Sequence, residues 1–547
     1  MRYVLAVILD CLCISAIGAA LFILLTGGGV YTIGHVRVSA RVPDNILLLV
    51  GVVLAIRYAI RDIPWFAVWP TESAVRVSER VVSAVPAWAR QLPLSSARQI
   101  LLVLVIASVA LKAWFAATSQ GFVTGDDVEI HEMSLGLLLH QPWPIWDLRS
   151  AVFPLGVVFP AQYIAHQAGV HDVGTLVFTG RLVVAVLSTL SIWLVWLAGR
   201  RLWPDTAGLA ILAAALFATA KLSVAFGSSE LPRPVATVFV LGAFAALQRR
   251  DDTSWRWAAV ALAVAASFRF SEAMFVAAAL TQLVLERRYR QAAGLILITV
   301  VIAAVLLGVA DAAYWGEAFH SVRAAFDFTV VQRLSSRGFQ PPWWYVASVG
   351  QWSTLPLAIL AGVGLRHQRR CAIWAVVPLC ALSALPHKEA RYMIPVVPFV
   401  CLLAVEGLRR SILFNATARR DWLPTALVCG LSLGLVHDVA HYRLPRSNAE
   451  VQLARTLFEG GETPGALVVE QAWRMGGHLY LPPVPIVDLD PGMMGRDGYL
   501  ASRLTSGTWV LVDRRSLSTA KVREALTGAG YHQARSDADS GYVLWRP

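Results

Sequence analysis

Charged side chains are scarce in this chain. Asp, Glu, Lys and Arg supply 15% of its 547 residues, whereas hydrophobic residues supply 57%. Soluble domains carry about 25% charged residues, because a surface that faces water needs them. An ordinary soluble enzyme is therefore excluded. The sequence instead contains many separate apolar runs that reach the ~17–25 residues needed to cross a bilayer.

Cysteines are also few, and they form no recognisable ligand set. All six lie within apolar runs: Cys11, Cys13, Cys371, Cys380, Cys401 and Cys429. No pair has the context of a zinc finger, and Cys11 and Cys13 stand too close in sequence for an unstrained disulfide. We interpret all six as small buried hydrophobic residues. The sequence also has no nucleotide-binding motif, no clear metal-binding motif and no internal repeat.

Apolar runs account for most of the chain. They lie near residues 4–26, 45–60, 99–117, 179–198, 206–226, 232–248, 256–286, 292–310, 346–365, 371–385, 392–408 and 423–440. The run at 256–286 is too long for one simple span and is interrupted by Arg269, so we predict two helices or half-helices that meet there. The fold class is then an all-α polytopic membrane protein with about 11–13 transmembrane helices. The first run lacks a basic leader and a clear cleavage site, so we expect a retained helix.

Basic residues set the expected orientation. The net charge is +12, but the arginines cluster in short loops between apolar runs. This pattern is typical of cytoplasmic loops rather than of a nucleic-acid partner. With the N-terminus in the cytoplasm, nearly all basic clusters fall inside, namely those at 57–98, 200–201, 249–250, 286–290, 366–370 and 409–420. The exception is the loop with Arg37 and Arg41. We expect this membrane to be a bacterial cell membrane. Three long segments then lie on its outer side: 118–178, 311–345 and everything after about 442.

Three parts of the chain differ in pattern. Residues 1–98 predict a two-helix membrane extension that ends in a basic, tryptophan-containing segment at 62–98. That segment is typical of a helix on the inner membrane surface, or of an ordinary amphipathic linker. Residues 99–441 predict the transmembrane core. Residues 442–547 predict a small extracytoplasmic α/β domain, with strands in 465–472, 485–490, 508–515 and 541–547 and helices in 447–461 and 516–530.

An acidic stretch opens the first outer segment. The sequence TGDDVEIHEMSLGLL at 124–138 follows a membrane helix and brings together Asp126, Asp127, Glu129 and Glu132. Carboxylates this close raise at least one pKa, and ionisable groups at a membrane surface are candidates for function. One of them could act as the general base that takes a proton from an acceptor hydroxyl group. A solvated acidic loop is the alternative.

Arginines recur near the outer segments. The sequence WPIWDLRSAVFPLG at 143–156 sets Arg149 beside Trp146 and other aromatic residues. Such a combination suits sugar faces and phosphate oxygens, but also an interfacial belt. Arg233 stands between two prolines at a helix junction, either as a site residue or as part of a turn. Arg269 could bind phosphate if it faces a cavity, or could pair with Glu272 as a purely structural contact.

The second outer segment begins and ends with aromatic residues. DAAYWGEAF at 311–319 brings Asp311 and Tyr314 to the membrane surface, and GFQPPWWYV at 338–346 brings Trp343 and Tyr345 there. Aromatic belts at membrane interfaces have a similar composition. We nevertheless expect these four residues to contact substrate.

The most specific feature is PHKEARYMIPVVP at 386–398. His387, Lys388, Glu389 and Arg391 form a dense charged cluster in a loop too short to be a solvated linker. Three potential cations with one carboxylate at a membrane surface suit a lipid phosphate. Fixed cations would also stabilise the charge that grows on this phosphate as it leaves.

Taken together, these strings resemble a known family. The His-Lys-Glu-x-Arg-Tyr string is similar to the signature of the dolichol-phosphate-mannose-dependent α-mannosyltransferases, which extend GPI anchors and N-glycan precursors and belong to the GT-C superfamily. GDDVEI with WDLRSAVFPLG resembles that family's Asp-Glu loop and its continuation. DAAYWGE resembles its Asp…Tyr-Tyr-Gly element, and PPWWY its Pro-Trp-His-Trp-Tyr element. The four matches fall in the family's order and cover roughly residues 99–410.

The resemblance implies a GT-C fold and an activity. Asp126 falls on the family's catalytic Asp and Asp127 on its partner acid, while the charged cluster at 387–391 would hold the lipid-linked donor. The implied reaction moves a hexose, most simply mannose, from a polyprenyl-phosphate donor to a hydroxyl group of a glycan or glycolipid acceptor, with inversion. No cofactor is expected, although the acidic loop leaves a divalent metal open.

The chain also departs from the family pattern. Asp127 replaces the usual Glu, Trp344 replaces a histidine, and Glu129 stands where an aromatic residue is common. We expect Glu129 to contact substrate, together with Trp146, Arg149 and Arg233. The C-terminal domain is reminiscent of bacterial GT-C enzymes instead.

Two other kinds of function stay open at this point. One is a GT-C enzyme that moves another sugar to a lipid or protein. The other is a lipid-linked sugar transporter or flippase, which should show paired halves or charged sites at mid-membrane. A non-catalytic subunit of an envelope-assembly complex is a further possibility.

Overall fold

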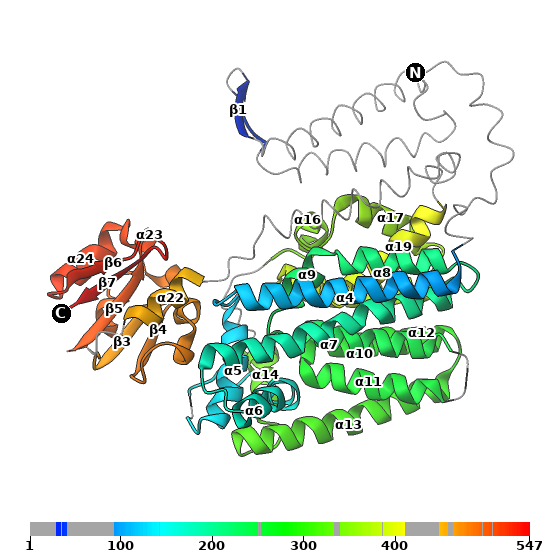
Figure 1. The fold of residues 1–547 in the computed structure, drawn as a ribbon, viewed down its shortest axis with the longest axis horizontal. Coiled ribbons are helices and arrows are strands. Elements are labelled where there is room, and N and C mark those ends of the chain that lie inside the picture. The colour runs from blue at the N-terminus through cyan, green and yellow to red at the C-terminus, as the bar shows by residue number, and fades with distance from the viewer. Residues whose placement is uncertain are drawn as a thin grey trace.

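A helical body followed by a small α/β domain makes up the computed structural model (Figure 1). The structure describes residues 29–33, 36–40 and 92–547, apart from 142, 250, 252, 333–339, 386, 411–447, 458–462, 495 and 506. The apolar runs expected at 4–26, 45–60 and 423–440, and nearly all of the basic segment at 62–98, lie outside the described residues. The strands β1 Gly29–Ile33 and β2 Val36–Ala40 form an antiparallel hairpin in the loop expected between the first two helices.

The helical body contains helices of very different length. In chain order they are α4 Leu94–Thr118, α5 Gly125–Leu138, α6 Phe159–Gln167, α7 Val173–Leu202, α8 Ala207–Ala218, α9 Lys221–Phe226, α10 Pro232–Leu247, α11 Ser254–Phe268, α12 Met274–Leu285, α13 Tyr289–Trp315, α14 His320–Phe326, α15 Trp344–Ala347, α16 Val349–Trp352, α17 Leu355–Leu365, α18 Arg369–Ala384 and α19 Val397–Arg410. Short π- and 3-10-helical turns add η2 Pro154–Val158, η3 Phe270–Ala273, η4 Asp327–Val331 and η5 Ala390–Met393. Among the described residues, α4, α7 and α13 are long and apolar enough to cross a membrane, and α8, α10, α17 and the η3–α12 pair are shorter apolar helices.

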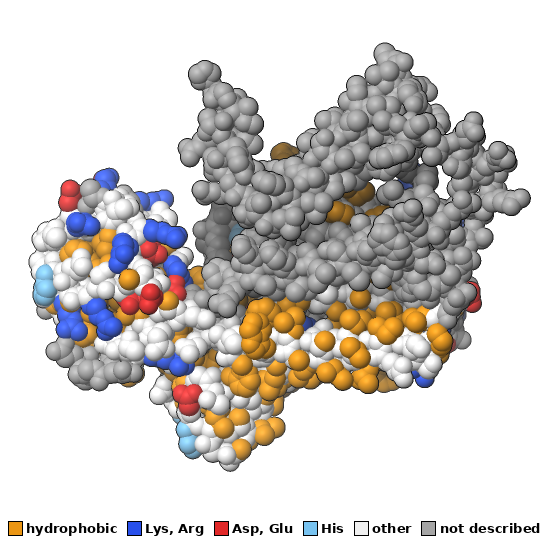
Figure 2. All heavy atoms as spheres, turned by 45° about the horizontal axis from the view of Figure 1, so that its top comes forward, with side chains coloured by type: hydrophobic (Ala, Val, Ile, Leu, Met, Phe, Trp, Pro, Cys, Tyr) orange, Lys and Arg blue, Asp and Glu red, His pale blue; other side chains and the backbone are white. Residues whose placement is uncertain are grey.

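The long helices present apolar side chains outward. Leu102 and Val103 on α4 and Val300 and Val309 on α13 are each exposed by 59–66%. On the described part of the helical body that is visible in Figure 2, hydrophobic side chains predominate, whereas Lys, Arg, Asp and Glu gather on the C-terminal domain. An apolar outer surface of this extent is unfavourable in water and stable in lipid. The chain is therefore a membrane protein with one water-facing domain.

The break predicted in the 256–286 run is confirmed. α11 ends at Phe268, Arg269 is extended with φ −153° and ψ 124°, and η3 then leads into α12. Two other predicted spans are also divided. The 206–226 run splits into α8 and α9, and the 346–365 run begins with the short helices α15 and α16 before α17.

Glycine allows two helices to pack with their backbones in contact. A Cβ atom placed on Gly364 of α17 would lie 2.0 Å from the carbonyl oxygen of Leu403, and one on Gly407 of α19 would lie 1.8 Å from that of Leu360. Small residues bring helices together in this way inside membranes. The contact fixes α19, and with it the charged loop that precedes α19.

The cysteine prediction needs one correction. Cys371 and Cys401 are buried, as expected, but Cys380 is exposed. Cys380 lies on α18, in a run of apolar residues, so its exposed position suits lipid rather than a packed interior. The other three cysteines lie outside the described residues.

The basic segments of the core meet at one end of the bundle. Arg370, at the start of α18, lies 2.7 Å from the carboxylate of Glu286 after α12 and donates to Gln248 after α10 at 3.2 Å. Arg409 and Arg410, at the end of α19, pair with the buried Glu406. Segments far apart in sequence therefore share this end, which is opposite to the end that carries α5, α6 and α14 (Figure 1).

The C-terminal domain is a five-stranded mixed sheet. Its elements are α22 Asn448–Leu457, β3 Ala466–Glu470, η6 Ala472–Met475, η7 Gly477–Leu479, β4 Ile486–Leu489, η8 Pro491–Met493, η9 Ala501–Arg503, β5 Thr508–Asp513, α23 Arg514–Leu517, α24 Ala520–Gly528, β6 His532–Ser536 and β7 Tyr542–Arg546. The strand order is β4-β3-β5-β7-β6, with β3 parallel to β4 and β5, and β7 antiparallel to β5 and β6. The four predicted strands are present. The sequence did not predict β6, because all its side chains are exposed and show no alternation.

This domain docks on the helical body next to α5. The Asn448 side chain accepts the backbone N–H groups of Gln120 and Gly121 at 2.9 and 2.8 Å. Glu132 of α5 accepts the backbone N–H of His478 at 2.7 Å. Apolar side chains of both parts also form one buried cluster, which includes Phe122, Val128, Leu135, Val451 and Leu479. The domain therefore holds α5 from its outer side.

Candidate active site

Two neighbouring aspartates at the start of α5 have different surroundings. Asp127 is fully buried, and its Oδ2 accepts the backbone N–H groups of Val123 and Thr124 at 3.1 and 3.0 Å. These bonds cap the helix, whose first N–H groups have no partner within it. Burial, reinforced by the charge of Glu230, raises the pKa of Asp127 to about 7. Asp127 therefore fixes the backbone at the start of α5, and this backbone positions the Asp126 side chain.

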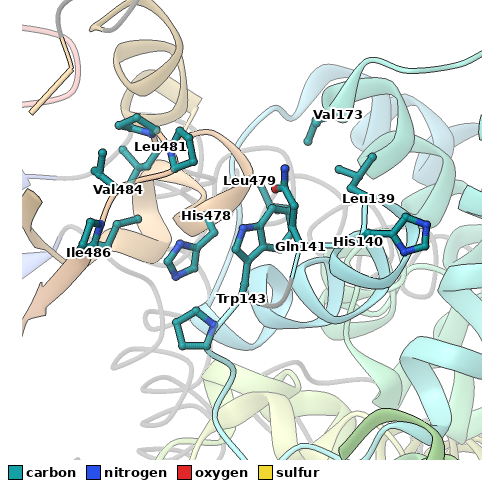
Figure 3. Close-up of a pocket in the computed structure, with 14 residues that line it drawn as sticks. Leu139, His140, Gln141, Trp143, Val173, His478, Leu479, Leu481, Val484 and Ile486 are labelled. Atoms are coloured by element: carbon teal, nitrogen blue, oxygen red, sulfur yellow. The ribbon is translucent and has the colours of Figure 1, made fainter. Parts of the chain in front are cut away.

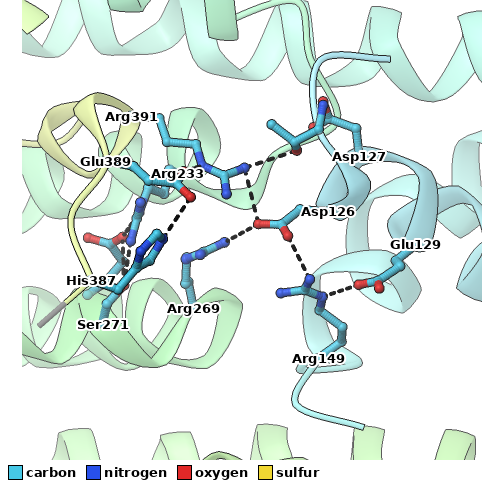
Figure 4. A network of polar contacts seen from close by, with 12 residues as sticks. Asp126, Asp127, Glu129, Arg149, Arg233, Arg269, Ser271, His387, Glu389 and Arg391 are labelled. Carbon is cyan, nitrogen blue, oxygen red and sulfur yellow. Dashed lines mark hydrogen bonds and ion pairs between the residues drawn. The ribbon is translucent and has the colours of Figure 1, made fainter. Parts of the chain in front are cut away.

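The carboxylate of Asp126 lies inside a ring of three arginines (Figure 4). Its Oδ1 is 2.6 Å from Nη2 of Arg149, and its Oδ2 is 3.2 Å from Nη1 of Arg391 and 3.5 Å from Nη1 of Arg269. The three arginines come from the loop after α5, from η5 and from the break after α11. The fold thus brings together an acid and cations that the sequence carries in four separate segments.

Further carboxylates hold two of these arginines in place. Arg149 Nε also pairs with Glu129, and Arg391 Nε pairs with Glu389. His387 Nε2 lies 2.9 Å from the other oxygen of Glu389. Burial alone would raise the pKa of Glu389, but the His387 hydrogen bond and the Arg391 charge hold it at about 2. Glu389 is therefore ionised. Arg391, which contacts both Glu389 and Asp126, links the predicted charged cluster at 387–391 to the acidic stretch at the start of α5.

Arg233 belongs to a second ion pair behind this ring. Its Nε donates to Glu272 at 3.0 Å and its Nη2 to the hydroxyl group of Ser271 at 2.9 Å. Its guanidinium group lies 4.0 Å from the ring centroid of Tyr392, and that of Arg269 lies 5.8 Å from the same ring. Glu272 thus pairs with Arg233, and the alternative pairing with Arg269 is not formed. Arg269 is instead directed toward Asp126 (Figure 4).

Other predicted site residues lie around this ring rather than in it. The Lys388 amine donates to the carbonyl oxygens of Gln340, at 2.9 Å, and of Leu385. This contact ties the charged cluster to the end of the second predicted outer segment. Trp146 is 42% exposed, and the guanidinium group of Arg149 lies 5.2 Å from its ring centroid.

The second predicted outer segment has mainly structural contacts in the described residues. Asp311 is buried and accepts the backbone N–H of Ser321 at 3.0 Å and its hydroxyl group at 2.7 Å. It therefore fixes the turn between α13 and α14. Tyr314 packs edge-on against its neighbour Trp315. Tyr345 is fully buried, whereas Trp343 is 67% exposed, so their side chains face different surroundings.

One buried network was not predicted. Arg181 of α7 donates to the carbonyl oxygens of Ser119 and Gly121 and to the Glu230 carboxylate. The same Glu230 oxygen lies 3.2 Å from Nε2 of His131 on α5. This network anchors the loop that leads into α5. A sequence signal was available, because Arg181 is a charged residue inside the apolar 179–198 run, where an unpaired charge is costly.

A groove of about 830 Å³ lies between the helical body and the C-terminal domain (Figure 3). Gln141 and Trp143 line it from the core, and His478 and Val484 line it from the domain. The rings of Trp143 and His478 stack with an interplanar angle of 10°. The groove begins beyond the last turn of α5, about 20 Å along the helix from Asp126 at 1.5 Å per residue. It is therefore separate from the arginine ring.

In the part of the chain that the structure describes, no group of three or more His, Cys, Asp or Glu side chains is arranged to hold a metal ion. The polar groups of the ring are paired with one another instead. What the ring offers is one carboxylate that can take a proton and several fixed positive charges beside it.

Solved structures share this fold. ArnT from Cupriavidus metallidurans in the apo state is 14% identical, with a TM-score of 0.56 over 81% of this chain and 97% of that one. ArnT from the same organism bound to undecaprenyl phosphate is 13% identical, with a TM-score of 0.55 and the same coverage. No curated protein sequence matches the chain. These two likenesses show a shared fold, and the family match of the core, described next, makes the chain a member of the GT-C superfamily.

The family follows from the sequence of the core. Residues 102–448, more than half of the chain, match the Alg9-like mannosyltransferase family. The chain therefore belongs to this family, and the resemblance found in the sequence motifs is confirmed. The matched region contains the whole arginine ring, and it ends at the first residue of α22.

Proposed function

We propose that this protein transfers a hexose, most simply mannose, from a polyprenyl-phosphate donor to a hydroxyl group of a glycan or glycolipid. The observation that carries this proposal is the Asp126 carboxylate inside a ring of three guanidinium groups. The reaction needs a base beside fixed cations, because an alcohol loses a proton while a phosphate gains charge.

The proposed chemistry is a single displacement. The acceptor oxygen forms a bond to the anomeric carbon, and Asp126 accepts the proton of that hydroxyl group. The bond from the anomeric carbon to the phosphate oxygen breaks, and its electron pair leaves on the phosphate. Arg391 and Arg269 lie beside Asp126 and stabilise the departing charge. Attack opposite to the leaving group inverts the anomeric centre.

Two comparisons support a lipid-phosphate mannose donor. The family is one of mannosyltransferases, and ArnT, which has the same fold, has been solved with undecaprenyl phosphate. His387, Lys388 and Glu389 adjoin Arg391 in the loop before α19 and would border the donor phosphate. The reaction is written without a metal, since a monophosphate leaving group has no pyrophosphate charge to neutralise. Unchanged activity in EDTA is the expected result.

The proposed orientation follows from the two ends of the bundle. The end where Arg370 meets Glu286 carries the basic segments and would face the cytoplasm, together with the N-terminus. The site and the C-terminal domain would then be extracytoplasmic. In intact cells, an impermeant thiol reagent should label Asp497→Cys, whose native side chain is 89% exposed, beyond the background of the parent protein. Labelling that requires lysis would reverse the orientation.

The decisive experiment supplies labelled polyprenyl-phosphate mannose and a membrane extract to the purified protein. Asp126→Asn should lower the transfer rate at least about a hundredfold, as expected for loss of a general base. Asp147→Asn is the matched control, because Asp147 lies on the loop after α5 with an exposed side chain outside the ring. Transfer by Asp126→Asn at the rate of the wild type would refute the proposed base.

The remaining candidates are separated by the same preparation. A panel of polyprenyl-phosphate sugars identifies the hexose, and transfer from a non-mannose donor alone would replace mannose in the proposal. Movement of the lipid-linked sugar across a vesicle membrane without formation of a glycosidic bond would instead indicate a transporter.

A further inference from the structure

The three arginines around Asp126 are not held equally. Arg149 has Glu129 as a second carboxylate partner, and Arg391 has Glu389. Among the described residues, Asp126 is the only carboxylate in ion-pair contact with Arg269, and their 3.5 Å contact is the longest of the three. Arg269 is therefore the arginine that can leave Asp126 at the lowest cost.

The position of Arg269 also allows its guanidinium group to move. The residue is extended between α11 and η3, and its side chain is 21% exposed. The guanidinium group has an aromatic neighbour, Tyr392, at 5.8 Å from the ring centroid. A contact with an aromatic face tolerates a shift of the cation better than a directional hydrogen bond does.

The positive and negative charges of the ring are already balanced before a donor binds. Asp126, Glu129 and Glu389 balance the three guanidinium groups (Figure 4). A donor phosphate brings additional negative charge into this balanced group, and a guanidinium group of the ring can neutralise it by leaving its carboxylate. In addition, a carboxylate with three cation partners accepts a proton poorly, because ion pairs stabilise its charged form.

We propose that Arg269 moves from Asp126 to the donor phosphate, so that donor binding releases the catalytic base. This inference rests on the proposed function and adds an order to it. The donor binds first, and Asp126 becomes able to deprotonate an acceptor once the phosphate has taken Arg269. An acceptor or a water molecule that arrives before the donor meets a base that is still paired.

The first test measures the affinity of undecaprenyl phosphate alone for the full-length protein in nanodiscs. Asp126→Asn removes the competitor for Arg269, so it should bind this lipid about tenfold more tightly than the wild type. Asp147→Asn is the matched control, because it removes one negative charge from an exposed position outside the ring and leaves the contact between Arg269 and Asp126. Its affinity should stay within about twofold of the wild type.

A double-mutant cycle then assigns the effect to Arg269. Arg269→Gln should weaken lipid binding, and adding Asp126→Asn to it should bring no further gain. The inference is overturned if Asp126→Asn binds no more tightly than Asp147→Asn, or if its gain persists without Arg269. Because this cycle uses lipid phosphate alone, it gives its answer whether or not the protein transfers a sugar. A wild type that transfers mannose but shows no coupling refutes this inference and leaves the proposed function intact.

The pH dependence supplies a readout that a merely structural role would not change. Among the described residues, the charged groups next to Asp126 are Arg149, Arg269, Arg391 and its neighbour Asp127, while Glu129 and Glu389 are bound to two of these arginines. In Arg269→Gln, the acid limb of kcat/KM for the donor should move to higher pH, because this constant reports the free enzyme, where Arg269 pairs with the base. The acid limb of kcat should stay in place, because Arg269 has already left Asp126 in the donor complex. Equal shifts of both limbs would overturn the inference.

Discussion

The guanidinium group of Arg391 lies 3.2 Å from the carboxylate of Asp126 and joins the loop before α19 to the first turn of α5. The same Nη1 donates to the hydroxyl group of Thr124 at 3.0 Å, while Nε pairs with Glu389. Although burial opposes its charge, Asp126 and Glu389 raise the pKa of Arg391 above its ordinary value. One planar side chain thus positions the proposed base, the helix cap and the charged cluster.

The first prediction concerns this planar geometry. Arg391→Lys keeps the positive charge but cannot serve Asp126 and Glu389 at once, because an ammonium group lacks the forked donors of a guanidinium group. We expect the transfer rate to fall at least about tenfold in an assay with labelled donor. Arg323→Lys, at an exposed ion pair with Glu317, should keep the wild-type rate. An Arg391→Lys enzyme as active as this control would show that charge alone is sufficient.

The second prediction separates the two aspartates. Asp127→Asn should keep most of the transfer activity, because an amide oxygen can still accept the N–H groups of Val123 and Thr124. Asp127→Ala should lower the thermal stability by about 1 kcal/mol or more through loss of the helix cap. Thermal unfolding in detergent and the transfer assay measure both effects. If Asp127→Asn is as inactive as Asp126→Asn, then Asp127 takes part in the chemistry itself.

Sequence patterns singled out the residues that the structure brings together around Asp126, but not the ion pairs among them. Motifs and apolar runs identified Asp126, Arg391 and the break at Arg269, because each is a local pattern that needs no knowledge of the packing. Such patterns could not predict that Glu272 pairs with Arg233, because α10 and η3 meet only in the folded bundle. The function of Lys388 in donor binding stays a prediction, because in this structure its amine is bonded to carbonyl oxygens.

The third prediction tests the packing that holds the charged loop. Gly364→Ala should destabilise the protein strongly, because the added Cβ atom would lie 2.0 Å from the carbonyl oxygen of Leu403, and a backbone cannot yield as a side chain can. We expect a lower thermal midpoint and reduced transfer, since α19 carries the loop with Arg391. Gly362→Ala on the same helix is the control, because its Cβ atom would meet no atom within 4 Å. Equal midpoints for the two variants would contradict the close contact of α17 and α19.

The fourth prediction concerns the junction between α5 and the C-terminal domain. Glu132 is 4% exposed, and burial raises its pKa from the ordinary 4.5 to about 8, although the N–H of His478 opposes this shift. The folded protein therefore holds this proton at pH values where the unfolded chain has lost it. Stability from Glu132 is full below about pH 4.5 and falls by about 1.4 kcal/mol per pH unit as the pH rises toward 8.

Glu132→Gln provides the measurement for this junction. A glutamine keeps an oxygen that can accept the N–H of His478 but carries no proton to lose. Between pH 5 and 8 the thermal midpoint of the wild type should therefore fall more steeply than that of Glu132→Gln. The slope that remains in the variant would come from other buried acids, above all Asp127, whose pKa is also raised, to about 7. Parallel slopes in both proteins would mean that Glu132 is already ionised at the junction, and that the domain tolerates a buried charge there.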